Sequence, residues 1–567
     1  MLVNNYKKYH WLSDYVHYIS TALIAFPTIL FIYWIYNHSF NMISRDEYRI
    51  AGNFIRQFHQ ATTFQEYLNA FFIQENESRP IVVRLLYLLT YWVEGTIDFK
   101  TVCLIGNIEM LTFLYILWVA LKKSPLSSIY FVPIPFITLN LAPYFTYLFS
   151  YETFFYVSSF FIPVAVFYTA TLGKYKASPY LLLFLCLGIG SITSIISLFI
   201  IGLRLFERKY VEVLLTGIIL LFSILIIPSS GVGKDAGTLL EIIHNWKELA
   251  LLVFSMIGSF SSILSKNAHF IIGVGMLVFG TTSFAILATL SWKNAYHRFL
   301  SISFLFFLAM LFLNCLRRWR HDYEGYLTEI INSHKIIFSV SLLPICYLIG
   351  VEALKHRKTL SYINLLGMGI FSVILYSIAN FNNILNIDTF NKNLHTDIVN
   401  WELSKSHPHD PYDSYRYMTN NQLFTHGKSF SHSFIENIKL RLKDTNRIET
   451  KYSLDILVEK SGVKNTYGFF TNTFTIQCGS YPFPKKYHQT NGIYLFLVSK
   501  KKTVMLPVRL NNLSVRKLVK SLNPYNDGFF CLSSNLDIPS DTYRIAVCAV
   551  QDMTITDFFY INKQLLL

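Results

Sequence analysis

Apolar and polar positions divide the chain into two parts of different character. Between residues 19 and 379, long apolar runs alternate with short polar connections, and the first run, 19–36, carries no charged residue. An α-helix rises 1.5 Å per residue, so a run of about 20 residues crosses the ~30 Å apolar core of a bilayer. The pattern predicts membrane-spanning helices in the apolar runs at 19–36, 102–121, 128–149, 154–172, 180–203, 211–228, 268–291, 298–316, 334–353 and 361–379.

Lysine and arginine residues near the ends of these runs predict their orientation, because cytoplasmic connections are rich in both residues. We place the N-terminus, with Lys7 and Lys8, in the cytoplasm. The run 180–203 must then form two short segments that meet near Gly188–Gly190, and the weaker run 249–264 must enter the membrane without crossing it. The result is about 11 crossings, with the C-terminus outside. The basic clusters that share the cytoplasmic side are Lys122–Lys123, Lys174–Lys176, Arg204–Lys209, Lys293–Arg298 and Lys355–Lys358.

The composition changes beyond residue 380, where polar residues dominate. Runs of β-branched and aromatic residues, separated by turn-forming residues, predict short strands at 452–459, 466–477, 492–499, 503–510 and 542–551. We therefore expect a mainly α-helical polytopic membrane protein. Its membrane domain takes residues 1–389, with a first outer loop at 38–100, and a small β-rich domain at 390–567 lies outside the membrane.

Composition supports the membrane class and narrows the partners. Hydrophobic residues make up 53% of the chain and charged residues 15%, with a mean hydropathy of +0.38, whereas soluble domains carry about 25% charged residues. Basic residues at the cytoplasmic ends of spans account for the net charge of +15, so no nucleic-acid partner is expected. The chain has no glycine-rich phosphate loop and no cysteine spacing typical of zinc. Two of Cys478, Cys531 and Cys548 could form a disulfide in an oxidising compartment.

The first outer loop holds two groups of charged residues close to the membrane. Residues 81–92, IVVRLLYLLTYW, predict a helix that lies flat on the bilayer surface. The charged residues are Asp46 and Glu47, soon after the first span, and Glu75, Glu77, Arg79 and Arg84 in QENESRPIVVR at 74–84.

A second outer segment, CLRRWRHDYEGY at 315–326, places arginines where the orientation rule disfavours them. Guanidinium groups bind phosphate oxygens through paired hydrogen bonds, so a lipid-linked phosphate at headgroup depth is the expected partner. Ordinary phospholipid headgroups are the alternative. The candidate residues of this segment are Arg317, Arg318, Arg320 and Tyr323.

Acids and arginines at one membrane face fit the transfer of a sugar from a polyprenyl-phosphate donor. A carboxylate takes the proton of the acceptor hydroxyl, and cationic groups stabilise the departing phosphate. We expect Asp46 or Glu47 to be the base and favour Asp46, since a short side chain near the end of a span holds its geometry better. The alternative is that these charges form ion pairs that position the surface helix.

Two further acids lie near or within the predicted spans. Glu109 falls inside the second span, where an acid is costly and marks either a functional site or a hydrogen-bonded structural residue. Glu152 falls in SYETFF, between two predicted spans. We expect it to be a solvated acid in a short outer turn, with the lining of an acceptor groove as the alternative.

The layout is similar to that of the GT-C class of membrane glycosyltransferases. It has a first span, an acidic pair in the first outer loop, surface helices, many further spans and an outer soluble domain. Within that class, ENESRPIVVRLL resembles the NEHR signature of bacterial polysaccharide-modifying membrane proteins through Glu77, Arg79 and Arg84, with Ser78 in place of the histidine. The pattern also resembles the serotype-converting glucosyltransferases of bacterial O-antigen.

The resemblance implies a glycosyltransferase that moves a sugar, expected to be glucose, from polyprenyl phosphate to a surface polysaccharide or O-antigen. The reaction would take place at the outer face of the bacterial inner membrane, with the β-rich domain in the periplasm and membrane lipids as further partners. No cofactor is implied for the whole class, since some members use a divalent cation and others do not. Asp46 and Glu47 would be catalytic, and the residues that bind donor or acceptor would be Glu75, Glu77, Arg79, Arg84, Arg317, Arg318, Arg320 and Tyr323.

Three other activities fit parts of the pattern. A polysaccharide O-acyltransferase needs a buried membrane histidine and usually a serine-hydrolase domain, but residues 390–567 contain no GDS-like motif. A polymerase or ligase would place its large outer loop late in the chain. A transporter of lipid-linked sugars would carry paired charges near the middle of the bilayer.

The orientation can be tested with reporter fusions. Fusions after Lys123 and Lys358 should report a cytoplasmic location, and fusions after Ser150 and at the C-terminus should report an external one, because basic residues flank only the first two sites. A cytoplasmic C-terminus would separate residues 38–100 from the β-rich domain and refute this topology.

Overall fold

The structure, a computed structural model, forms two compact units. The helical unit comprises Met1–Ser39, Ala61–Thr90 and Lys100–Asn383, and the sheet unit comprises Phe40–Gln60, Tyr91–Phe99 and Ile384–Leu567. The residues that the structure describes are 10–43, 47–74, 79–188, 192–226, 244–261, 266–290, 294–318, 336–404, 414–425, 432–444, 448–449, 455–459, 473–479, 481, 490–510, 528–534, 538 and 541–566.

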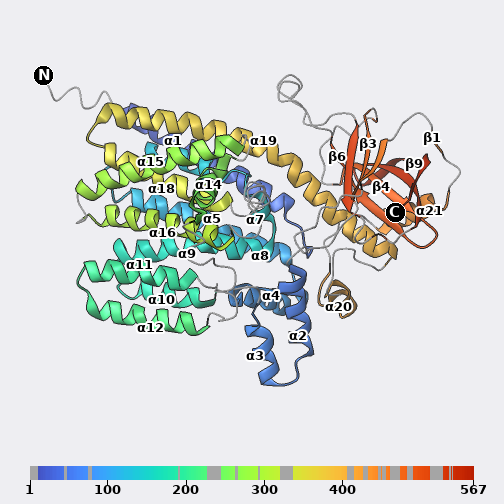
Figure 1. The fold of residues 1–567 in the computed structure, drawn as a ribbon, viewed down its shortest axis with the longest axis horizontal. Helices are drawn as coiled ribbons and strands as arrows, with labels where there is room; N and C mark the ends of the chain where they lie inside the picture. The colour runs from blue at the N-terminus through green and yellow to red at the C-terminus, as the bar shows by residue number, and fades with distance from the viewer. Residues whose placement is uncertain are drawn as a thin grey trace. The chain divides into compact units, whose positions relative to one another are not determined.

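The long helices of the helical unit run side by side along one direction (Figure 1). Seven of the described helices are long and apolar enough to cross a membrane, within His17–His38, Phe99–Leu121, Ser150–Thr171, His269–Thr289, Ala295–Leu316, Ile336–Leu354 and Thr359–Leu403. The predicted class, a mainly helical membrane protein with a small β-rich part, is confirmed at this level. The helices are α1 (His10–His38), α3 (Phe64–Phe72), α4 (Ile81–Glu94), α5 (Phe99–Leu121), η3 (Ser128–Phe131), α6 (Pro133–Thr138), α7 (Tyr144–Leu148), α8 (Ser150–Glu152), η4 (Thr153–Val157), α9 (Ser158–Thr171), α10 (Ser178–Leu185), η5 (Cys186–Gly188), α11 (Ile192–Phe206), α12 (Tyr210–Ile226), α14 (Trp246–Ile257), η6 (Ser259–Ser261), α15 (Lys266–Leu290), α16 (Ala295–Arg318), α18 (Ile336–Leu354) and α19 (Lys358–Ser404).

The apolar run 128–149 does not form the single helix that we predicted. It divides into η3, α6 and α7, and residues 139–143 between the last two are not helical. Pro133 occupies the first turn of α6 and Pro143 precedes α7. Proline lacks a backbone N–H and its ring clashes with the preceding turn, so it begins a helix more readily than it continues one.

Two irregular segments agree with the sequence. In the run 180–203, α10 ends at Leu185 and the 3₁₀ turn η5 follows, which agrees with the predicted break, while residues 189–191 lie outside the described residues. In the weak run 249–264, α14 has 12 residues, or a length of about 18 Å, which is too short to cross a bilayer. The number of about 11 crossings stays a prediction.

Helix α18 is the central helix of the helical unit. Its residues Ile336 to Glu352 are all buried, and it packs against α6, α14, α15 and α16. A helix that is apolar on every face belongs inside a bundle. By contrast, α1, α12 and α15 expose large apolar side chains such as Ile29, Leu214 and Ile271, as expected of helices that face lipid.

The sheet unit contains two sheets with a shared apolar core. The described strands are β1 (Ile448–Glu449), β2 (Asp455–Glu459), β3 (Thr473–Cys478), β4 (Gly492–Val498), β5 (Thr503–Pro507), β6 (Arg509–Leu510), β7 (Phe529–Ser534), β8 (Thr542–Gln551) and β9 (Thr554–Leu566). One sheet has the order β1-β9-β8-β4-β5, the other β2-β3-β7-β6, and every pair is antiparallel except β1 with β9. The predicted strands at 452–459, 466–477, 492–499, 503–510 and 542–551 overlap β2, β3, β4, β5 with β6, and β8, although residues 452–454 and 466–472 lie outside the described residues. Strands β1, β7 and β9 were not predicted.

Both faces of the five-stranded sheet are buried. Ile493 and Leu495 of β4 join the core between the two sheets, while Tyr494 and Phe496 pack on the other face. That second face is covered by α21 (His432–Lys443), through Phe434 among others, and by the end of α19. Burial on both sides explains why β4 reads as a continuous apolar run rather than as an alternating one. The unit also contains η2 (Tyr48–Asn53), α2 (Phe54–Gln60) and α20 (Ser414–Asn420).

Helix α19 is continuous over 47 residues and belongs to both units. Its second half is part of the sheet unit, where the Asn400 side chain donates to the Met505 carbonyl at 3.0 Å and accepts from the Met505 N–H at 2.7 Å. Met505 lies on β5, an edge of the five-stranded sheet, so α19 covers that edge. The division that we predicted at 389/390 falls inside this helix.

Helices α14 and α15 approach each other through glycines. A Cβ atom on Gly273 would lie 1.9 Å from the carbonyl oxygen of Phe254, and one on Gly258 would lie 2.0 Å from that of His269. Small residues allow the close backbone contact on which helix pairs in membranes depend. The short helix α14 is therefore fixed against α15 by backbone fit.

This contact predicts that substitutions of two glycines of α15 differ in their effect on the stability of the protein. Gly273→Ala should destabilise the protein by roughly 1–3 kcal/mol, because the added methyl group overpacks the contact. Gly275→Ala is the matched control, since a Cβ there has nothing within 4 Å, and it should change stability little. Thermal unfolding of the purified protein in detergent measures both; equal melting temperatures for the two variants would contradict the contact.

Candidate functional site

The structure places only some of the predicted site residues. Glu47, Arg79 and Arg84 are described in full; Glu47 belongs to the sheet unit and both arginines to the helical unit. Arg317 and Arg318 form the last turn of α16, where only the backbone is described. Outside the described residues lie Asp46, Glu75, Glu77, Arg320 and Tyr323.

Arg84 is completely buried in the first turn of α4. Its Nη1 donates to the carbonyl oxygens of Phe71 at 2.8 Å and Ile73 at 2.7 Å. These carbonyls end α3, where helices leave backbone acceptors without intrahelical donors and where positive charge is favourable. Arg84 therefore joins α4 to the end of α3. This contact corresponds to the positioning role that the sequence left as the alternative to phosphate binding.

One turn further along α4, Tyr87 connects to the helical core. Its hydroxyl lies 2.8 Å from Ser150 Oγ, and both side chains are buried. Ser150 begins the short helix α8, which ends at Glu152. Helix α4 and the acid Glu152 are thus connected through the Tyr87–Ser150 hydrogen bond and the short helix α8.

Glu152 is 8% exposed and helical, so the solvated turn that we predicted for it is wrong. The reason is the broken run 128–149: α7 ends at Leu148, and Phe149 is extended before α8 begins. The chain therefore turns at Phe149 and directs residues 150–152 into the unit. Burial of an acid here is costly unless the site uses or pairs its charge.

Two buried glutamates share an uncommon backbone setting. Glu47, 2% exposed, directly precedes the π-helix η2, and Glu152 directly precedes the π-helix η4. Well under 1% of residues lie in π-helices, and these turns are frequent at functional sites, where the extra residue redirects side chains. The coincidence of a buried acid and a π turn at both positions marks them as candidate site residues.

Glycines allow close packing at both π turns. A Cβ atom on Gly106 of α5 would lie 2.6 Å from Cγ2 of Thr153 in η4. In the sheet unit, a Cβ on Gly52 of η2 would lie 2.6 Å from Cβ of Ser414 in α20. Each π turn is thus held from one side by a contact that excludes any larger residue at the glycine.

Polar groups of α5 satisfy the backbone beside η4. The amide of Asn107 donates to the carbonyl oxygens of Tyr147 at 2.8 Å and Cys103 at 2.9 Å. The Cys103 thiol also donates to the Tyr147 carbonyl, at 3.0 Å. Because α7 ends at Leu148, its last carbonyls lack helical donors, and these side chains supply them. Two polar residues in an apolar run were the one sequence feature that pointed to this cluster.

Glu109 is the other acid that the sequence singled out. It accepts a hydrogen bond of 2.6 Å from Ser158 at the start of α9. This contact fits the hydrogen-bonded structural residue that we considered for this position.

A second polar cluster occupies the opposite end of α16 from Arg317 and Arg318. Both oxygens of the fully buried Glu352 are used: one contacts His297 Nε2 at 2.9 Å and Lys355 Nζ, and the other accepts from Ser124 Oγ at 2.8 Å. The next residue of α16, Arg298, lies 3.6 Å from Glu207. The cluster joins the ends of several helices, and both Glu352 and Glu207 have basic partners, so we interpret it as a set of structural contacts.

Glu207 shows how basic residues of this second cluster keep a carboxyl group ionised. Burial alone would raise the pKa of its carboxyl group, but Lys209 and Arg204, at 2.8 Å and 2.5 Å, hold that pKa below its usual range. Glu207 is therefore ionised at neutral pH. The sequence predicted these basic residues as markers of the cytoplasmic side, but not the acids that pair with them.

Metal ligands do not gather in the part of the chain that the structure describes. No group of three or more His, Cys, Asp or Glu side chains there could hold a metal ion. Comparisons with protein-family models, with curated proteins and with solved structures found no match for this chain. The functional assignment therefore depends on the residues themselves.

The hydrogen bonds of Arg84 predict that its replacement lowers the stability of α3. Arg84→Gln should destabilise α3 by roughly 1.5–3 kcal/mol, the usual range for a hydrogen bond to a charged group. Hydrogen–deuterium exchange should then be faster over residues 64–72. Arg79→Gln in the same segment is the control, because Arg79 is only half-buried, and it should leave that exchange unchanged. Normal protection of α3 in Arg84→Gln would show that the capping contact is unimportant.

Proposed function

We propose that this protein is a membrane glycosyltransferase that moves a sugar from a polyprenyl-phosphate donor to a surface polysaccharide. The reaction would occur at the outer face of the bacterial inner membrane. Glucose is the sugar that the resemblance in the first outer loop suggests, and O-antigen is the acceptor.

The observation that carries this proposal is Glu47. It is a buried acid that precedes a π turn, in the segment between the first two long apolar helices, α1 and α5. It directly follows Asp46 in the sequence. The residue follows the end of the first span by nine positions in the sequence, so its carboxylate would be close to the depth of the headgroup of a lipid-linked donor. A firmly held side chain is what proton transfer requires.

The chemistry assigns a separate task to each type of residue. The acceptor hydroxyl oxygen would attack the anomeric carbon of the sugar while the bond from that carbon to the phosphate oxygen breaks. The electron pair of that bond leaves with the polyprenyl phosphate, and the hydroxyl proton moves to the carboxylate of Asp46 or Glu47. Arginine side chains would stabilise the charge that develops on the departing phosphate. Arg79, Arg317 and Arg318 are the candidates, since Arg84 is engaged with the end of α3.

Glu152 is a further acid in the proposal, beside Asp46 and Glu47. Its burial, its π turn and the Tyr87–Ser150 hydrogen bond beside it support a role in binding donor or acceptor hydroxyl groups. The sheet unit would contribute to acceptor binding. A hollow of about 340 Å³ on that unit is lined by polar side chains of α21 and the β8–β9 turn, including Asn437, Arg441 and Asp552.

Conservative substitutions of the acidic pair test the proposal. Asp46→Asn with Glu47→Gln keeps the size of both side chains and removes their basicity, so transfer should fall by a factor of about 10²–10⁴. The assay follows a labelled sugar from a polyprenyl-phosphate donor to the polysaccharide acceptor with purified protein in detergent.

Glu66→Gln is the matched control for this assay, since Glu66 is an exposed acid of the same inter-span segment that caps α3. It should leave transfer close to normal. Near-normal transfer by the double variant would refute the catalytic assignment, and absence of transfer by the unaltered protein from every donor tested would refute the function.

A further inference from the structure

The hollow on the sheet unit lies between helix α21 and the turn that joins β8 to β9. Its volume of about 340 Å³ is at the small end of the range for ligand sites, which is about 300–1,000 Å³. Helix α21 contributes Ser433, Asn437 and Arg441, whose spacing of four residues places them on one side of the helix. Residues 552–555, in the turn and the start of β9, form the opposite wall.

The lining of the hollow combines hydrogen-bond donors with acceptors. The Arg441 guanidinium only donates, an ionised Asp552 carboxylate only accepts, and the Asn437 amide does both. A simple anion would be repelled by Asp552, and a simple cation would be repelled by Arg441. Neighbouring hydroxyl groups of a sugar each donate and accept, so they match the whole set.

Apolar side chains complete the hollow. Phe434 is buried in the core on this face of the sheet, while Met553 and Ile555 are half-buried at the surface. A sugar ring presents C–H groups on its faces and hydroxyl groups at its edge. Its site therefore needs an apolar patch beside a few well-placed polar groups, and an inorganic ion needs no such patch.

The turn in one wall has a strained backbone. Gln551 pairs with Thr554, and the two residues between them, Asp552 and Met553, both have positive φ angles, of 48° and 63°. This geometry is that of a two-residue hairpin turn whose second position favours glycine, whereas a methionine there is strained. Strain of this kind is frequent at ligand sites, and Met553 lines the hollow.

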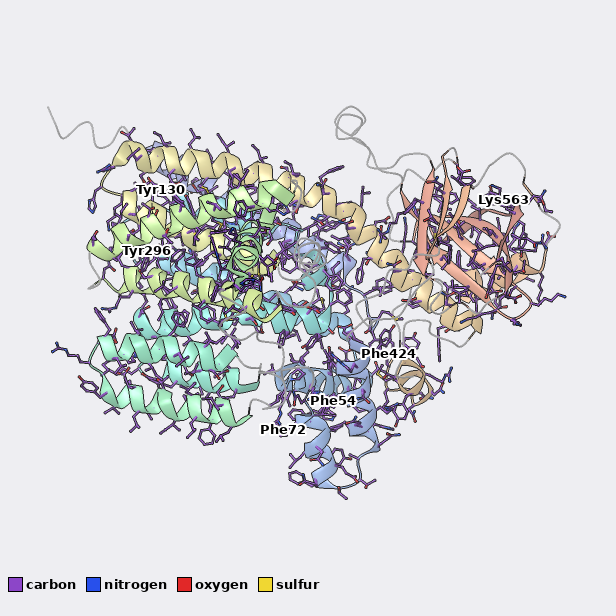
Figure 2. The ribbon with its side chains drawn as sticks, viewed as in Figure 1. Phe54, Phe72, Tyr130, Tyr296, Phe424 and Lys563 are labelled. Carbon is purple, nitrogen blue, oxygen red and sulfur yellow. The ribbon has the colours of Figure 1, made fainter. Side chains whose placement is uncertain are left out.

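Hydrogen bonds fix both walls to the sheet. The buried Asn491 side chain accepts from the Asp552 N–H at 2.6 Å, and its amide nitrogen donates to the Asp552 carboxylate at 3.5 Å. The Tyr560 hydroxyl of β9 donates to the Leu442 carbonyl of α21 at 2.8 Å. Lys563, labelled in Figure 2, is near the other end of β9 from the turn. A site whose walls are already fixed loses less conformational entropy when a ligand binds.

We propose that the hollow binds a neutral saccharide, with Arg441, Asn437 and Asp552 on its hydroxyl groups and Met553 against the face of a sugar ring. The inference deepens the proposed function by naming a saccharide site on the sheet unit. That the bound saccharide is part of the polysaccharide acceptor rests on the proposed function. Binding of a sugar in the hollow does not.

Saturation-transfer difference NMR on the full chain tests the proposal. The protein is held in lipid nanodiscs, because detergents with sugar headgroups would compete for the hollow. The neutral probes are maltose, lactose and cellobiose, and the anionic probes are digalacturonic acid and inorganic phosphate. We expect neutral disaccharides to bind, with the strongest signals from protons on one face of a ring, and we expect neither anion to displace them.

A pair of variants on α21 tests the contact with hydroxyl groups. Arg441→Gln should weaken saccharide binding by roughly tenfold, the effect of losing a hydrogen bond to a charged group. Lys443→Gln is the matched control, since it removes the same charge from an exposed position of the same helix that does not line the hollow. It should leave binding unchanged.

Met553→Gly separates contact with the ligand from the conformation of the turn. Glycine adopts positive φ without strain, so this variant should unfold at a higher temperature than the unaltered protein. Its saccharide binding should nevertheless be several-fold weaker, because one wall of the hollow loses its side chain. A higher melting temperature with unchanged binding would contradict the role of Met553.

Three results would overturn the proposal. They are the failure of all three neutral disaccharides to bind, equal binding by Arg441→Gln and the unaltered protein, and preferential binding of digalacturonic acid or phosphate. The measurement contains no lipid-linked donor, so it is independent of the transfer assay. Saccharide binding without any transfer would refute the proposed function alone, and transfer without saccharide binding would refute this inference alone.

Discussion

A polar group inside an apolar helical unit must find its hydrogen-bond partner within the protein, because lipid offers none. This constraint shapes the helical unit wherever its helices break. Helix α7 ends inside the unit, and its last carbonyls are satisfied by Asn107 and Cys103 of α5. Helix α3 ends against Arg84, and Glu352 at the end of α18 has partners for both of its oxygens. These polar contacts join helices that apolar packing alone would leave free to slide.

The same constraint applies to the two buried glutamates, Glu47 and Glu152. An ionised or even a neutral carboxyl group is expensive to bury, and a π turn, held by close packing on a glycine, places each one. Glu47 and Glu152 lie in different compact units, so each has its own structural support. Two buried acids beside irregular helical turns are the features on which the proposed sugar transfer rests.

The segment between α1 and α5 combines three kinds of contact within a short length of chain. Glu47 is buried in the sheet unit, Arg84 is buried in the helical unit, and Phe64 of α3 is exposed. Charge by itself would assign this segment to a solvent-exposed loop, whereas hydropathy by itself would assign parts of it to a span. Within the helical unit, the capping box at the start of α3 and the Arg84 contact at its end fix this short helix.

The hydropathy of the chain and the spacing of its apolar and polar residues determined the class of the protein, most of the long helices and five of the strand positions. These features depend on the length of apolar runs and on local propensity, which are properties of neighbouring residues. The break of the run 128–149, the continuation of α19 into the sheet unit, and the burial of Glu152 and Arg84 depended on contacts between residues far apart in the chain. Periodicity cannot reveal them, because whether an acid or an arginine is solvated or buried depends on what another segment places beside it. Tertiary structure alone supplied those neighbours: Ser150 for Tyr87, the end of α3 for Arg84, and the close approach of Gly106 to the π turn after Glu152.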